Sequence, residues 1–402
     1  MEGGNRGLIG LDEVVAAAER LRGVIRPTPV TRADAIGKVV GRTLLLKPEQ
    51  LQRAGSFKIR GAYNRISGLP RGTAVVAASA GNHAQGVALA ASLTGATSTI
   101  FMPASAPLPK VQATRDYGAE IRLVDGVVDD AIAAARAHAA ETGAVLVHPF
   151  DDPLIIAGQG TVGLELLDEA TDAEVVLVPI GGGGLISGVA TAVHGHVRVI
   201  GVEAAGAAKV GRSLELGAPV RLDSVATMAD GIAVKSPSAL TLAHIDALVD
   251  DVITVTEEEI SQAVVLLLER AKAVVEPAGA VGVAALLAGK VAGTGAVVSV
   301  LSGGNVDPLL LTKLIEHGLS AAGRYLVLRV VVADRPGALA ALTAAVATMG
   351  LNVLSVDHHR AGLELAVDEV EVLLTLETRD PAHRDEVVSD LRGQGYRVDL
   401  VR

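Results

Sequence analysis

The chain has 402 residues, enough for two or three domains, and 50% of them are hydrophobic while only 2% are aromatic. Its 35 basic and 45 acidic residues give a net charge of −10, and no basic stripe or aromatic platform is present, which argues against a nucleic-acid partner. The absence of cysteine excludes disulfides, thiolate catalysis and cysteine-based zinc sites. No segment of about 20 residues stays apolar, and the first residues lack the long apolar segment of a secretory signal. We therefore expect no membrane contact and a cytoplasmic location.

In chain order, the first predicted element is an amphipathic helix over residues 11–21, where apolar side chains recur at helical spacing. Residues 43–47 predict a short strand. From about residue 61, short strands alternate with alanine-rich helices, and these strands cover residues 74–77, 97–102 and 120–124. This alternation predicts βαβ units with parallel strands and right-handed crossovers.

Four loops that carry polar or glycine residues follow predicted strands. Lys58 lies between the loop 52–55 and the first turn of a predicted helix, and Asn82 follows the strand at 74–77. Gly181–Gly184 and Ser302 follow the apolar runs 175–180 and 296–300. An open α/β sheet binds its ligand at the carboxyl ends of its strands, so these loops define a candidate site.

Each of these residues also has an ordinary structural explanation. A lysine near a helix start is most often solvated and protonated, Asn82 is a possible helix N-cap, and Ser302 a possible turn residue. The four glycines present backbone N–H groups to an anion, which predicts a phosphate site. They do not match G-x-G-x-x-G in any register, and no Gly-Lys-Ser/Thr follows them, so a nucleotide loop is disfavoured.

A second module is predicted after the small residues at 318–323. Its order is βαββαβ, with strands at 325–332, 352–360, 369–376 and 396–401 and helices at 338–349 and 380–392.

The ordered set of motifs resembles the threonine dehydratase (threonine ammonia-lyase) family, in the tryptophan synthase β-like group of pyridoxal phosphate enzymes. The motifs that carry the resemblance are residues 47–52, 56–62, 78–86, 181–184, 229–234, 276–280 and 302–305. The terminal module, with Asp-Arg-Pro-Gly-Ala-Leu at 334–339, resembles an ACT domain.

The resemblance implies an α/β fold of type II, with a two-lobed, open, parallel-sheet catalytic domain over residues 1–322. A small lobe of about residues 61–150 is inserted in the large lobe, and a ferredoxin-like ACT domain covers residues 323–402. Two roles stay open for the ACT-like module, which either binds an amino-acid effector where two copies pair or only supports dimerisation. Family resemblance also implies a homodimer or homotetramer.

The resemblance assigns roles around pyridoxal 5'-phosphate. Lys58 is the catalytic residue and holds the cofactor covalently, Asn82 bonds its phenolic oxygen, and Ser302 bonds its ring nitrogen. Further cofactor contacts are implied for Phe57, Gly181, Gly182, Gly183, Gly184, Leu185 and Glu276. Substrate contacts are implied for Ser79, Ala80, Gly81, Asn82, His83, Asp230 and Gly231.

A neutral hydroxyl at the ring nitrogen limits charge delocalisation into the ring, which favours β-elimination over transamination. We therefore predict that Lys58 acts as general base and that L-threonine gives 2-oxobutanoate and ammonia. L-Serine, which lacks one methyl group, is expected to react to pyruvate as a side activity. The alternatives are a serine racemase, a 3-hydroxyaspartate ammonia-lyase, or a non-catalytic amino-acid sensor. Whether the route serves isoleucine biosynthesis or threonine breakdown stays open.

Two positions depart from related racemases. Those relatives carry a serine where this chain has Ala80, so racemisation is disfavoured. They also bind a divalent cation through a glutamate, a carbonyl and an aspartate. Glu203 and Ala207 fit the first two positions, but Lys209 stands in place of the aspartate, and we predict no metal.

Overall fold

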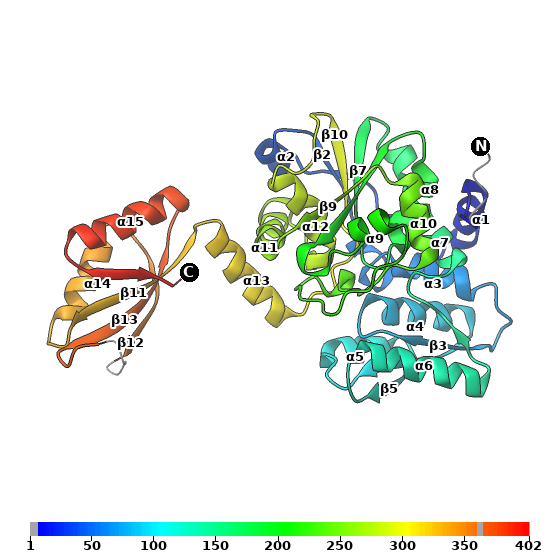
Figure 1. Ribbon diagram of the computed structural model, residues 1–402, viewed down its shortest axis with the longest axis horizontal. Helices are drawn as coiled ribbons and strands as arrows, with labels where there is room; N and C mark the ends of the chain where they lie inside the picture. Colours follow the sequence, from blue (N-terminus) through cyan, green and yellow to red (C-terminus); the bar gives the residue numbers. More distant parts are fainter. Residues whose placement is uncertain (1–6, 360–364, 402) are drawn as a thin grey trace. The chain divides into compact units, whose positions relative to one another are not determined.

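The computed structural model describes residues 7–359 and 365–401, and it forms two compact units (Figure 1). The first unit ends at Asp307 and the second begins at Pro308. Helix α13 (Pro308–Ala321) thus belongs to the second unit. Of the small residues at 318–323, after which a second module was predicted, those up to Ala321 lie in this helix and the last two follow it, with Gly323 at φ of +67°. The domain boundary after residue 322 remains a prediction.

A six-stranded sheet forms the centre of the first unit. Its strand order is β1-β2-β10-β7-β8-β9, and all pairs are parallel except the edge pair of β1 with β2. The strands are β1 (Thr31–Arg32), β2 (Leu44–Lys47), β7 (Ala173–Pro179), β8 (Arg198–Ala204), β9 (Asp251–Val255) and β10 (Ala296–Val300). The central strands read as continuous buried apolar runs, as expected where helices cover both faces of a parallel sheet.

Helices flank this sheet, and of these only α1 was predicted with bounds from the sequence. They are α1 (Leu11–Leu21), α2 (Asp34–Val40), α7 (Pro153–Glu169), α8 (Gly184–Val193), α9 (Val210–Leu216), α10 (Ala239–Leu248), α11 (Glu257–Leu266) and α12 (Pro277–Leu287). Helix α1 has the predicted bounds, and its apolar face buries Val14, Ala17 and Leu21. Helix α7 begins with an Asp152 N-cap and proline in the first turn, which fixes its start.

A second sheet of the first unit has four parallel strands in the order β5-β4-β3-β6. These strands are β3 (Ala74–Ala78), β4 (Thr97–Pro103), β5 (Glu120–Val124) and β6 (Val145–Leu146). They confirm the three predicted strands and their parallel pairing. The associated helices are α3 (Lys58–Ile66), α4 (Asn82–Thr94), α5 (Leu108–Asp116) and α6 (Val128–Thr142).

Helices α3 and α7 cross at two glycines. A Cβ added at Gly158 would lie 2.6 Å from the Cα atom of Gly61, so neither position has room for a side chain. This close crossing fixes the position of α3 against α7, and therefore the position of Lys58, the first residue of α3.

The second unit has an antiparallel sheet in the order β12-β13-β11-β14, with α14 (Ala338–Thr348) and α15 (Pro381–Gly393) packed on it. The strands are β11 (Tyr325–Ala333), β12 (Val353–His359), β13 (Glu369–Glu377) and β14 (Arg397–Leu400). The predicted βαββαβ order is confirmed, although Arg360, predicted in the second strand, lies outside the described residues. Side chains of β11 alternate between buried and half-buried, which gives the sheet one core face.

Candidate active site

The loop before Lys58 and the loop that holds Ser302 are paired through their backbones. They continue the parallel pairing of β2 with β10, because the amide of Leu301 donates to the carbonyl of Lys47 (2.9 Å). Beyond the strands, the amide of Phe57 donates to the carbonyl of Ser302 (3.1 Å), and the amide of Gly304 donates to Gly55 (3.0 Å). The two loops therefore form one unit at the carboxyl end of the large sheet.

The amine of Lys58 is partly buried at the start of α3. Its Nζ donates to the carbonyl of Pro149 (3.1 Å) and lies 5.0 Å from the centre of the Phe57 ring. Burial lowers the pKa of Lys58 to about 8, although the negative charge of Glu276 works in the opposite direction. A substantial fraction of this amine is neutral near pH 8, as a nucleophile or base requires.

The four glycines connect β7 to α8 and form a cradle without side chains. Gly183 has φ of +96°, a conformation that favours glycine, and α8 begins at Gly184. The N–H groups of the first helical turn have no partner inside the helix, and the helix dipole favours negative charge there. Leu185 has its side chain buried in the core, so only its backbone faces the cradle end of the helix.

The glycine cradle and Lys58 meet at one short segment. Pro149 accepts the hydrogen bond from Lys58, and the next residue, Phe150, packs on the cradle. A Cβ added at Gly182 would lie 2.1 Å from the Phe150 ring, and one at Gly184 would lie 2.9 Å from Phe150 Cβ. One two-residue segment therefore connects an amine with a lowered pKa to a helix start whose N–H groups favour an anion, and an aldehyde cofactor with a phosphate group would need both.

Asn82 and Glu276 are hydrogen-bonded across the site. Asn82 begins α4, and its Nδ2 donates to Oε1 of Glu276 (2.6 Å). Glu276 is 8% exposed, and burial raises the pKa of its carboxyl group to about 7 while the hydrogen bond from Asn82 opposes the shift. Gly303 lies against both side chains, since a Cβ there would be 2.5 Å from the Glu276 oxygen. Asn82, Glu276 and the Ser302 loop therefore meet at one place.

The predicted substrate loop lies between β3 and α4. The amide of Gly81 donates to Ser79 Oγ (3.1 Å), which shapes the turn at Ala80. His83 is buried, and its Nε2 lies 2.9 Å from the carbonyl of Val147. Burial and the positive charge of Lys58 lower the pKa of His83 to about 3, so the ring stays neutral at physiological pH.

Asp230 and Gly231 enter from a 3-10 turn between α9 and α10. The carbonyl of Gly231 would lie 3.3 Å from a Cβ at Gly181, so this turn contacts the cradle. Asp230 is exposed and pairs with Lys110 of α5 (3.3 Å). Lys110 was not predicted from the sequence, because nothing in its local pattern connects it to a residue 120 positions later.

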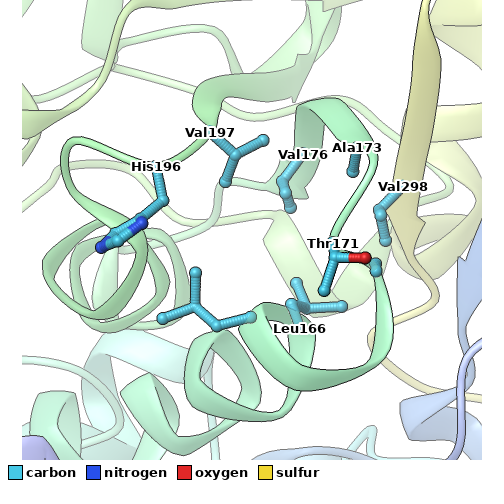
Figure 2. A pocket seen from close by; sticks show the side chains of 9 residues that line it. Leu166, Thr171, Ala173, Val176, His196, Val197 and Val298 are labelled. Carbon is cyan, nitrogen blue, oxygen red and sulfur yellow. The ribbon is translucent and has the colours of Figure 1, made fainter.

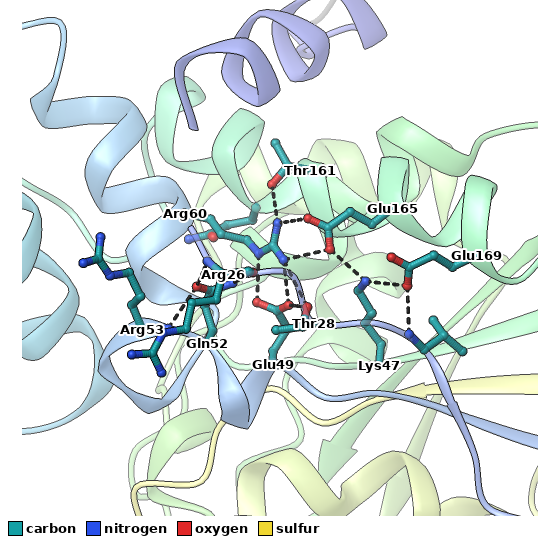
Figure 3. A network of polar contacts seen from close by, with 12 residues as sticks. Arg26, Thr28, Lys47, Glu49, Gln52, Arg53, Arg60, Thr161, Glu165 and Glu169 are labelled. Carbon is teal, nitrogen blue, oxygen red and sulfur yellow. Dashed lines mark hydrogen bonds and ion pairs between the residues drawn. The ribbon is translucent and has the colours of Figure 1, made fainter. Parts of the chain in front are cut away.

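Behind the site, a buried network of charged side chains holds α3 in place (Figure 3). The guanidinium of Arg60 is fully buried and donates through Nη2 to Glu49 Oε1 (2.7 Å) and Glu165 Oε2 (2.9 Å). Lys47 contacts Glu165 (2.7 Å) and Glu169 (3.0 Å). Burial opposes the charge of Arg60, but the two carboxylates raise its pKa overall. The network joins β2, α3 and α7, and its central residue, Arg60, is two residues after Lys58 in α3.

Lys209 fills the position discussed above for a cation. Its buried Nζ lies 2.8 Å from Glu203 Oε1 and 3.1 Å from the carbonyl of Ala207. Over residues 7–359 and 365–401, no group of three potential metal-ligating side chains is found. In the same described ranges, no helix is both long and apolar enough to cross a membrane.

A cavity of about 220 Å³ lies away from the site, where α7 ends and β7 begins (Figure 2). Its wall is mainly apolar and includes Leu166, Val176, His196 and Val298. The cradle follows the opposite end of β7, so this cavity is separate from the Lys58 site.

The fold and the arrangement of the site are those of a pyridoxal phosphate enzyme with an additional βαββαβ module, and comparison with known families agrees. The family described as "Pyridoxal-phosphate dependent enzyme" matches residues 21–303, and the ACT domain family matches residues 326–393. The chain belongs to the pyridoxal-phosphate-dependent enzyme family and carries an ACT domain.

Similar proteins cover nearly the whole chain. The L-threonine ammonia-lyase of Geobacter sulfurreducens is 50% identical over 96% of this chain and 98% of its own length. The L-threonine ammonia-lyase of Thermotoga maritima is 46% identical over 98% of this chain and its own full length (100%). Among solved structures, the T.th. threonine deaminase superposes with a TM-score of 0.71 at 41% identity, covering 74% of this chain and 99% of that one.

Proposed function

We propose that this protein is an L-threonine ammonia-lyase that converts L-threonine to 2-oxobutanoate and ammonia. The observation that carries the proposal is the amine of Lys58 beside the glycine cradle, joined through Pro149 and Phe150. The two relatives named L-threonine ammonia-lyase, aligned over nearly the full chain, support the choice of substrate.

The bound cofactor supplies an electron sink for the charge that develops when the α-proton leaves. The chain supplies the base, because the Lys58 amine with a pKa of about 8 can take that proton near neutral pH. The cradle Gly181–Gly184 would hold the phosphate, and Asn82 and Ser302 would orient the ring through its phenolic oxygen and its nitrogen. Glu276 would keep the side chain of Asn82 in place through their hydrogen bond.

The loop 79–83 would receive the substrate carboxylate. It lies at the start of α4, where backbone N–H groups and the helix dipole favour an anion. His83 is uncharged at physiological pH, and its hydrogen bond to Val147 makes it a fixed part of the loop. L-Serine would fit the same contacts, so we expect the slower formation of pyruvate.

Around the catalytic unit, three further features stay proposals. An amino acid would be the effector of the ACT domain, and the protein would form a homodimer or homotetramer. A cytoplasmic location would suit an enzyme of amino-acid metabolism.

The test compares three proteins in a 2-oxo acid assay with L-threonine. Wild type and Lys38→Ala, which changes an exposed lysine of α2, are expected to form 2-oxobutanoate at similar rates. Lys58→Ala is expected to lose at least about 10³-fold in kcat, since both the covalent anchor and the base are removed. No product from the wild type, or undiminished product from Lys58→Ala, would contradict the proposal. Chiral analysis of serine in the same samples separates elimination from racemisation.

A further inference from the structure

Asn305 connects three parts of the site that are far apart in the sequence. It lies in the loop after β10, and its Nδ2 donates to the backbone carbonyl of Ala54 (2.8 Å) and to Oδ1 of Asn82 (2.8 Å). The same nitrogen lies 3.3 Å from Oε1 of Gln85 on α4. One amide group thus binds the loop before Lys58 and the helix that begins at Asn82.

The direction of these hydrogen bonds is fixed by the carbonyl of Ala54. A backbone carbonyl only accepts, so the Asn305 atom that faces it must be the amide nitrogen. That nitrogen also faces Asn82, which must therefore present its oxygen to Asn305. The remaining group of Asn82, its Nδ2, then points to Glu276. Glu276 takes one of the two hydrogens, which leaves the second for a ligand.

The close approach of Asn305 is built into the loop. Ala54 adopts φ of +59°, which is uncommon for a residue other than glycine and aims its carbonyl at Asn305. At the next position, a Cβ on Gly55 would lie 2.3 Å from Asn305 Oδ1. The side chain of Asn305 therefore packs against Ala54, which has an uncommon backbone conformation, and against Gly55, where any side chain would collide with it.

We propose that Asn305 is a positioning residue that locks the amide of Asn82 with its second N–H group, the one not taken by Glu276, directed at the phenolic oxygen of the cofactor. This inference rests on the proposed function, because it assumes that the cofactor binds at this site. Without Asn305, only Glu276 orients the Asn82 amide, and a protonated Glu276 can donate to the Asn82 oxygen instead of accepting from its nitrogen. The amide can then rotate by 180° and present its oxygen to the cofactor oxygen. Two acceptors would then face each other, and the cofactor would lose a donor.

A purely structural role would give a different result. The two loops are already joined by the backbone bonds from Gly304 to Gly55 and from Phe57 to Ser302, which need no side chain of Asn305. Loss of the side chain would then lower thermal stability and leave the bound cofactor unchanged.

The experiment uses full-length Asn305→Asp, which keeps the shape of the side chain, removes its donor and adds a negative charge. Asn305→Leu, which removes the donor without adding a charge, is measured beside it, and the two variants are expected to behave alike. Wild type and variants are stripped of cofactor and titrated with pyridoxal 5'-phosphate, and the pH midpoint of the visible absorbance of the bound cofactor is recorded. We expect the cofactor Kd to rise by about tenfold, as for the loss of one net hydrogen bond. The pH midpoint is expected to move upward by about one unit, since a donor that stabilises the oxyanion is lost.

The effect must also disappear when Asn82 is removed. In an Asn82→Ala background, Asn305→Asp is expected to change Kd by less than about twofold, because the two residues act as one unit. Asn352→Asp is the matched control, since Asn352 is an exposed asparagine in the second unit that bonds Glu377 (3.1 Å). It should leave both cofactor readouts unchanged.

An unchanged pH midpoint with a lowered melting temperature would overturn the proposal, as would an undiminished tenfold effect in the Asn82→Ala background. Should Asn305→Asp fail to fold, Asn305→Ser is measured in the same way against the same criteria. A wild-type protein that gives no visible absorbance with the cofactor would defeat the proposed function itself. A wild-type spectrum for the variant would defeat only the role of Asn305.

Discussion

At the scale of single residues, the site contains two ionisable groups, Lys58 and Glu276, whose pKa values differ strongly from the ordinary values of lysine and glutamate. Burial lowers the pKa of Lys58 to about 8 and raises that of Glu276 to about 7. Both shifts favour the neutral form of a group inside the site. The two groups therefore change protonation within a narrow range just above neutral pH, where a proton-transfer reaction operates well.

The pKa of Lys58 gives a prediction for cofactor attachment. The neutral amine attacks the cofactor aldehyde, so the rate of attachment to the cofactor-free protein should rise with pH and level off above about pH 8. An ordinary lysine would give a midpoint more than two units higher, near about 10.4. Stopped-flow absorbance between about pH 6 and 10 measures the midpoint. A midpoint near 10 would show that the amine is solvated.

The residue contacts of the site were only partly predictable. The predicted strands were enough to assign four groups to loops at strand ends, namely Lys58, Asn82, the glycines 181–184 and Ser302. Asn305 stood in a recognised motif without a role, because its partners lie 223 and 251 positions away in the sequence. Local periodicity contains no information about such pairings.

At the scale of elements, α3 is held from behind by the network around Arg60. The guanidinium is fully buried between Glu49 and Glu165, so its removal would leave the buried carboxylate of Glu49 without its ion-pair partner and Glu165 with Lys47 alone. Breaking a buried pair of this kind is costly, whereas an exposed pair contributes little.

We therefore expect Arg60→Met to lower the free energy of unfolding by about 3–5 kcal/mol. The matched control is Arg122→Met, whose partly exposed pair with Glu120 should contribute less than about 1 kcal/mol. Urea denaturation is followed by circular dichroism, because the chain has no tryptophan. Equal destabilisation by the two substitutions would contradict a special role of the buried network.

Most elements were predictable because their apolar periodicity is strong. The strands β2, β3, β4, β5, β7 and β10 lie within two residues of their predicted bounds. The π-helical turn Leu267–Ala271 and the left-handed Lys272 after it were not predicted. The sequence of this segment is typical of an ordinary α-helix. The wider π-helical turn depends on tertiary packing, which the local sequence does not contain.

At the scale of the whole molecule, the chain combines a catalytic unit and an ACT domain that are compact by themselves. The T.th. threonine deaminase covers 74% of this chain and 99% of its own, so a catalytic unit without the second module exists among the similar structures. The first unit is therefore expected to fold alone.

A chain that ends at Asp307 should keep the lyase activity on L-threonine and lose any response to amino acids. In the full-length protein, an effector that couples the two units would change substrate affinity by about 5–150-fold. Kinetics of both proteins with isoleucine, valine and serine added would measure the coupling. An effector response that survives in the shortened chain would place the effector site in the catalytic unit instead.

The neighbouring residues Pro149 and Phe150 have a consequence for how the first unit works. They lie in the connection from the four-stranded sheet to α7, and they touch the reactive amine on one side and the glycine cradle on the other. A small displacement between the two sheets is therefore felt by both groups together. Phosphate affinity and the pKa of Lys58 are then expected to change together whenever the two sheets move relative to each other.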